Sequence, residues 1–161
     1  MRPRAGEVWA CAVGLLGVAH IAQNALAFVA YQQKEVYGFE GALASIPRGA
    51  NVVGLMYARD SAYVGEHPFM HYVAYCQAEH GGTVEYSFAE TSQSPFYYVS
   101  PENLPKVNLG YGWTPQASNP QELASYFECV LSRGDNAHLR RVARHYNRIY
   151  QLNRWAVWKR R

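Results

Sequence analysis

The stretch VWACAVGLLGVAHIAQNALAFVAYQQ, from Val8 to Gln33, carries no Asp, Glu, Lys or Arg and decides how the chain is organised. About 20 predominantly apolar residues suffice to cross the hydrocarbon core of a bilayer. Arg2 and Arg4 lie just ahead of the stretch, and basic residues beside a span favour the cytoplasmic side. The sequence therefore predicts a membrane segment over residues 1–30, with everything after it outside the cytoplasm.

Three alternatives remain open for this segment. As an uncleaved span, residues 8–30 would anchor the protein in the membrane. As a signal peptide, the segment would be cut after Ala27, because Ala25-Leu26-Ala27 forms an A-x-A cleavage site ahead of Phe28. The third alternative is a buried helix of a soluble protein, because His20, Gln23 and Asn24 suit a lone lipid-facing helix poorly. We favour the anchor on the length of the apolar run.

The remainder, about 120 to 130 residues, is enough for one domain with its own core. With 49% hydrophobic and 17% charged residues, the chain has the composition of a folded protein. A net charge of +3 is too small to indicate a polyanionic partner by itself. A disulfide between Cys76 and Cys129 is chemically allowed outside the cytoplasm. Two buried free thiols are the favoured alternative, because the pair shows no framework spacing.

Apolar runs that alternate with helix signals predict an α/β fold. Residues 31–49 are expected to form an amphipathic connecting helix, and residues 50–161 an extracytoplasmic α/β domain. Within the domain we expect strands at Asn51–Ala58, Thr83–Ala89 and Tyr126–Ser132. We expect one helix from Pro68 to His80, a second after an Asn119 cap, and a third from Ala137 to about Tyr146 with Asn136 as its cap. A hairpin is expected at Arg148–Lys159, turning at Asn153-Arg154. The first strand, helix and second strand make a βαβ unit. The expected architecture is a small three-layer α/β sandwich with a mostly parallel sheet and a C-terminal hairpin.

Polar residues follow three of the expected strands, where ligands gather in open α/β sheets. They are Arg59 and Asp60 after the first strand, Glu90 after the second, and Arg133 and Asp135 after the third. These five residues are the candidate lining of one ligand-binding crevice. Because loops are commonly polar without any function, the crevice is a hypothesis.

The sequence shows no catalytic or cofactor motif. Residues 58–63, after the first strand, lack the glycines of a phosphate-binding loop, and no G-x-S-x-G motif occurs. Zinc-type ligands are present at His67, His71, Cys76 and His80. However, the five-residue step from His71 to Cys76 turns the two pairs about 140° apart on a helix. We therefore expect no cofactor, no metal site and no catalytic residue in this chain.

The C-terminal part is both basic and aromatic. Its residues are Arg140, Arg141, Arg144, Arg148, Arg154, Lys159, Arg160 and Arg161, interleaved with Tyr146, Tyr150, Trp155 and Trp158. This mixture suits nucleic acid, through phosphate contacts and stacking, and also a membrane surface with anionic headgroups. We favour a solvated helix face beside a hairpin whose aromatic side chains fill the core, and expect no nucleic-acid partner.

Four segments together resemble a known kind of domain. They are IPRGANVVGLMY (Ile46–Tyr57), HPFMHYVAYCQAEHGGTVEYSFAETSQSPFYY (His67–Tyr98), YFECVLSRGD (Tyr126–Asp135) and RIYQLNRWAVWKRR (Arg148–Arg161). They resemble the soluble tail of bacterial polytopic membrane proteins similar to glycosyltransferases of the C superfold, which use lipid-linked sugars. The resemblance implies a last transmembrane helix, a short amphipathic helix and a small extracytoplasmic α/β domain. The acidic catalytic residues of that superfamily lie in a multi-helix region with no counterpart here, so none is carried over.

Three functional hypotheses follow. The favoured one is a non-catalytic extracytoplasmic domain on one N-terminal helix, at the outer face of the cytoplasmic membrane, which assists a polytopic glycosyltransferase or is a fragment of one. Its expected partners are membrane lipid and that polytopic membrane protein, and its oligomeric state is open. The second is a small hydrolase or transferase that acts on a phosphate- or sugar-bearing substrate in the crevice. The third is a basic nucleic-acid-binding module.

Overall fold

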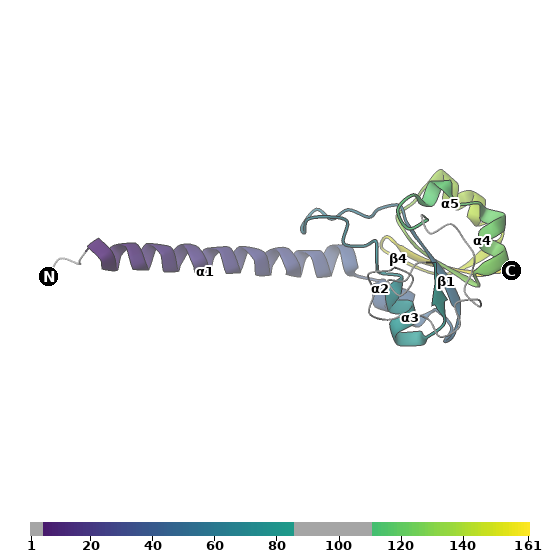
Figure 1. The fold of residues 1–161 in the computed structure, drawn as a ribbon, viewed down its shortest axis with the longest axis horizontal. Helices are drawn as coiled ribbons and strands as arrows, with labels where there is room; N and C mark the ends of the chain where they lie inside the picture. Colours follow the sequence, from purple (N-terminus) through teal and green to yellow (C-terminus); the bar gives the residue numbers. More distant parts are fainter. Residues whose placement is uncertain (1–4, 86–110) are drawn as a thin grey trace, which may run out of the picture.

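The computed structural model describes residues 5–85 and 111–161, and it shows a long N-terminal helix that projects from an α/β domain (Figure 1). Helix α1 spans Ala5–Tyr31, and the π-helix η1 continues it over Gln32–Val36. The helix is long and apolar enough to cross a membrane, and none of its most apolar window is buried against the domain. In this structure α1 is therefore not a buried core helix.

Within the described residues, five strands form one mixed sheet in the order β2-β1-β3-β5-β4. The strands are β1 (Asn51–Met56), β2 (Thr83–Val84), β3 (Cys129–Arg133), β4 (Tyr146–Leu152) and β5 (Trp155–Arg160). β1 pairs in parallel with β2 and β3, whereas β5 pairs antiparallel with β3 and β4. The prediction of a mostly parallel sheet is therefore wrong. The hairpin is the reason, because β5 folds back between β3 and β4 and runs against both.

Helices lie on both faces of the sheet, and each face has its own core (Figure 1). The helices are α2 (Phe39–Ala44), α3 (Ala74–His80), the short 3-10 helix η4 (Pro115–Ala117), α4 (Pro120–Tyr126) and α5 (Ala137–Val142). Residues of α2 and α3 pack in one cluster with Val52 and Leu131, while residues of α4 and α5 pack in the other with Val53 and Val130. β1 is thus covered on both faces, as its continuous apolar run predicts.

Several local predictions are confirmed. β1, α3 and β2 follow in order with parallel strands, as expected for a βαβ unit; residues 86–89 of the expected second strand lie outside the described residues. The Asn119 and Asn136 side chains each accept a hydrogen bond from a backbone N–H in the first turn of the helix that follows. The hairpin turns between β4 and β5 at Asn153-Arg154, the predicted position.

The connecting helix is broken, although the sequence predicts one continuous amphipathic helix. Between η1 and α2, Gly38 adopts a φ of +97°. A Cβ at this position would lie 2.9 Å from the carbonyl oxygen of Leu152, so the close approach of the hairpin requires glycine. Val36 and Phe39, on either side of the break, are both buried. The change of direction at Gly38 therefore lets both segments contribute to the core.

Helix α3 begins at Ala74, six residues after the predicted start at Pro68. The preceding residues form successive tight turns, in which the N–H of Met70 donates to His67 and that of Tyr72 donates to Phe69. These turns bury Phe69 completely. Packing of this ring therefore prevails over the local preference for a helix that starts at proline.

We expect Gly82→Ala to destabilise the domain more than Gly49→Ala. Both glycines have a positive φ, +83° and +75°, but a Cβ on Gly82 would lie 2.1 Å from the carbonyl oxygen of Ala50, while the space at Gly49 is open. The expected losses in free energy of unfolding are roughly 3 and roughly 1 kcal/mol. Thermal unfolding of the full chain in detergent, followed by tryptophan fluorescence, measures both. Equal losses would contradict the close approach of Gly82 to Ala50.

Candidate functional site

The end of the long helix is built into the domain. The indole N–H of Trp155 donates to the carbonyl oxygen of Glu35 (3.2 Å), and the side-chain amide of Asn153 donates to that of Lys34 (2.8 Å). The backbone N–H of Ala62 donates to the Glu35 carboxylate (3.0 Å). Both the β4–β5 turn and the segment between β1 and α3 therefore meet η1 where the helix enters the domain (Figure 1).

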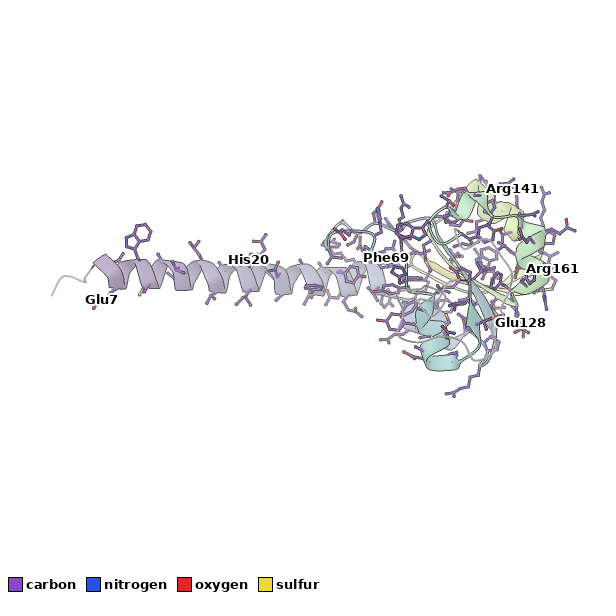
Figure 2. The ribbon with its side chains drawn as sticks, viewed as in Figure 1. Glu7, His20, Phe69, Glu128, Arg141 and Arg161 are labelled. Atoms are coloured by element: carbon purple, nitrogen blue, oxygen red, sulfur yellow. The ribbon has the colours of Figure 1, made fainter. Side chains whose placement is uncertain are left out.

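A fully buried arginine lies beside this junction. Arg133 is the last residue of β3, and its guanidinium carbon lies 3.4 Å from the ring centroid of Phe69 and 5.6 Å from that of Trp155. Figure 2 shows Phe69 near the point where the helix joins the domain. One guanidinium nitrogen donates to the carbonyl oxygen of Ala58. Within the described part of the chain, Nε and Nη2 of Arg133 and Oε2 of Glu35 are buried without a hydrogen-bond partner.

The charge of Arg133 is only partly compensated. Burial and the nearby charge of Arg154 lower the pKa of Arg133 to about 10, whereas the Glu35 carboxylate acts in the opposite direction. Glu35 is itself buried in η1. Arg133 and Glu35 are therefore two buried, oppositely charged groups, contributed by the sheet and by the helix, and removal of either would leave the other uncompensated.

The residues predicted to line one crevice have different surroundings. Arg59 donates to the carbonyl oxygen of Trp113 (3.2 Å), and the exposed Asp60 pairs with His67. Glu90 lies outside the described residues. A crevice lined by all five residues therefore stays a prediction.

The other two residues of the predicted crevice, Arg133 and Asp135, differ in solvent exposure. Arg133 is buried against Phe69, whereas Asp135 is exposed and lines a pocket of about 360 Å³. This basic pocket lies between α5, the end of β3 and the β4–β5 hairpin, and Arg133 is not among its lining residues. Its charged lining residues are Asp135, Arg140, Arg148 and Arg154, and its apolar ones include Leu139, Trp155 and Trp158.

The three pocket arginines belong to the basic C-terminal tract that the sequence shows, but the sequence does not separate them from the other basic residues. In the structure the tract divides. Trp155 and Tyr146 are fully buried, as the favoured core interpretation expects. Arg160 donates to the carbonyl oxygen of Ala124 and Arg161 to the Asn147 side chain, away from the pocket lining. Convergence of Arg140, Arg148 and Arg154 depends on how α5 packs beside the hairpin, so no local signal predicts it.

The described histidines and cysteines have the surroundings of structural residues, not those of metal ligands or reactive thiols. Among residues 5–85 and 111–161, no group of three or more His, Cys, Asp or Glu side chains is placed to hold a metal ion. Cys76 and Cys129 are free thiols buried in the same core cluster. Burial raises the pKa of both thiols, and that of Cys76 reaches about 12. Neither thiol therefore has the exposed, electropositive surroundings of a reactive cysteine.

Comparisons of the chain with models of protein families, with curated proteins and with solved structures found no match. The resemblance to glycosyltransferase tails therefore stays a prediction.

Glu35→Gln is expected to lower the free energy of unfolding by about 3 kcal/mol, because Arg133 would stay charged and buried without its opposing carboxylate. Glu40→Gln, exposed on α2, is the matched control and should change stability by less than about 0.5 kcal/mol. Adding Arg133→Met to Glu35→Gln should recover most of the loss, because it removes the remaining buried charge. Denaturant unfolding in detergent measures all three. A double variant no more stable than Glu35→Gln would contradict the coupling of the two charges.

The stability of the domain should fall between pH 9 and pH 12. Burial raises the pKa of Cys76 from 9.0 to about 12, so in this interval the unfolded chain has lost a proton that the folded chain retains. This group alone should reduce the free energy of unfolding by about 1.4 kcal/mol per pH unit. Cys76→Ala should flatten the pH slope by that amount, although it also weakens the core at neutral pH. Cys11→Ala, on α1, is the control, and equal slopes in both variants would exclude the Cys76 contribution.

Proposed function

We propose that this chain is a single-pass membrane protein whose α/β domain acts at the outer face of the cytoplasmic membrane, without catalytic residues of its own. The observation that carries the proposal is the continuity of α1 with the domain. An apolar helix with no burial over its most apolar window passes directly into η1, where Glu35 and Val36 are buried. The apolar surface of α1 needs a covering that the domain does not supply, and a bilayer supplies it.

The structure of the junction favours an uncleaved anchor over a signal peptide. Ala27 lies inside the continuous helix α1, one turn before Tyr31. The ring of Tyr31 stacks on Phe69 with 5.4 Å between centroids, and its hydroxyl lies 2.8 Å from that of Tyr72. Cleavage after Ala27 would cut the helix just before its contacts with the core begin. The anchor is therefore the alternative that we propose.

Helix length supports a domain that rests directly on the membrane surface. At about 1.5 Å per residue, about 20 residues cross a hydrocarbon core of about 30 Å. If residues 8–28 form the span, η1 follows within about two turns, at the depth of the lipid headgroups. Trp9 near one end of that span and Tyr31 near the other are of the types enriched at membrane interfaces.

One face of α1 supports a partner within the membrane. The Asn24 amide lies 3.1 Å from Nε2 of His20, one turn away, and this polar pair is exposed. Gly17 lies on the same helix face, three residues before His20. Polar pairs and small residues in membrane helices typically face other helices and not lipid. We therefore propose a polytopic membrane protein as partner, and the resemblance to glycosyltransferase tails indicates the class of enzyme that the domain would assist.

Cysteine labelling tests the anchorage and the orientation together. The native thiols should give little labelling of their own, because Cys76 and Cys129 are buried and Cys11 would lie within the span. Ala78→Cys, exposed on α3, should react with a membrane-impermeant maleimide when the cytoplasmic membrane is intact. Glu7→Cys, at the start of α1, is the matched control and should react only after permeabilisation.

Three outcomes would overturn parts of the proposal. Reversed reactivity of the two cysteines would mean a cytoplasmic domain. Recovery of the full-length chain in the soluble fraction after lysis would exclude the anchor. Mass spectrometry of a mature chain that begins at Phe28 would show that the segment is a cleaved signal.

A further inference from the structure

The basic pocket concentrates positive charge that has no internal partner. Arg140 comes from α5, Arg148 from β4 and Arg154 from the β4–β5 turn, and all three line the same pocket and are exposed. The one ion pair found among residues 5–85 and 111–161 joins His67 to Asp60, so none of these arginines is paired with a carboxylate there. Three guanidinium groups with free donors make a site for an anion.

The rest of the lining favours an anion that carries more than charge. The guanidinium carbon of Arg148 lies 5.4 Å from the ring centroid of Trp158, which orients the charge and provides an apolar wall. The Asp135 carboxylate contributes a negatively charged hydrogen-bond acceptor to the lining. The pocket of about 360 Å³ lies in the range of small-ligand sites, about 300 to 1,000 Å³. Its size and its mixed lining suit a phosphate together with the polar group esterified to it.

The hairpin turn that lines the pocket contacts the end of the long helix. The Asn153 side chain donates to the carbonyl oxygens of Lys34 (2.8 Å) and Tyr37 (3.3 Å), which fixes the β4–β5 turn against η1. Arg154 is the next residue of that turn, and its carbonyl oxygen accepts from the N–H of Gly134 (2.8 Å). If α1 crosses the bilayer, Arg154 therefore lies within reach of the lipid headgroups.

We propose that this pocket binds the phosphate of an anionic membrane lipid. Arg140 and Arg154 donate to the phosphate oxygens, and Arg148 faces the same group from its position over Trp158. Asp135 accepts a hydrogen bond from a hydroxyl group of the lipid headgroup. The phosphate chemistry depends on the pocket alone, whereas a lipid as its source rests on the proposed membrane anchorage.

Calorimetric titration of the full chain in uncharged maltoside micelles tests this proposal. The probes are dioctanoyl phosphatidylglycerol, dioctanoyl phosphatidylcholine as the neutral lipid, and glycerol 3-phosphate as the soluble phosphate. Arg140→Gln/Arg154→Gln removes two pocket charges, and Arg141→Gln/Arg144→Gln removes two exposed charges from the same region outside the pocket lining. Thermal unfolding establishes that both double variants are folded.

We expect phosphatidylglycerol to bind the wild type, with affinity at least tenfold lower in Arg140→Gln/Arg154→Gln and within twofold of wild type in Arg141→Gln/Arg144→Gln. Equal weakening in both double variants would reduce the effect to net charge and overturn the pocket. Equal binding of the neutral lipid would overturn the need for an anion. Glycerol 3-phosphate that binds as tightly as the lipid would overturn the lipid source. Since micelles impose no topology, these outcomes are independent of the labelling experiment.

Discussion

The attachment of the long helix to the β4–β5 hairpin is the constraint on which the rest of the structure depends. Carbonyl oxygens of Lys34 and Glu35 in η1 accept hydrogen bonds from Asn153 and Trp155. A π-helix shifts its backbone hydrogen bonds out of the α-helical register, and such segments recur at functional positions. Here the two hairpin side chains donate their hydrogen bonds to backbone carbonyl oxygens within the π-helix. No flexible linker separates helix from sheet, so the orientation of the domain follows from that of α1.

Two buried, oppositely charged groups lie at the junction, Glu35 and Arg133. Glu35 belongs to η1 and Arg133 to the end of β3, and the Glu35 carboxylate acts in the direction that favours the charged form of Arg133. Burial of both groups carries a desolvation penalty, and apolar replacements are often at least as stable.

The mixed sheet explains why a pocket can form next to the junction. Insertion of β5 between β3 and β4 brings the β4–β5 turn to the edge of the sheet where β3 ends. Arg154 thereby meets Gly134 and Asp135, and α5 brings Arg140 to the same place. A parallel partner of β3 would have ended at this edge, so the β4–β5 turn would not lie there. The departure from the predicted topology is thus also what assembles the candidate ligand site.

The sequence by itself determined the features that depend on neighbouring residues. The uncharged run from Val8 to Gln33 defines the long helix, the apolar run of β1 defines a strand covered on both faces, and asparagine caps mark α4 and α5. Tertiary structure decided the rest: Arg133 is buried while Asp135 is exposed, Gly38 breaks the connecting helix, and three arginines from separate elements converge. These outcomes depend on contacts between residues far apart in the chain, such as Gly38 with Leu152, which local patterns do not encode.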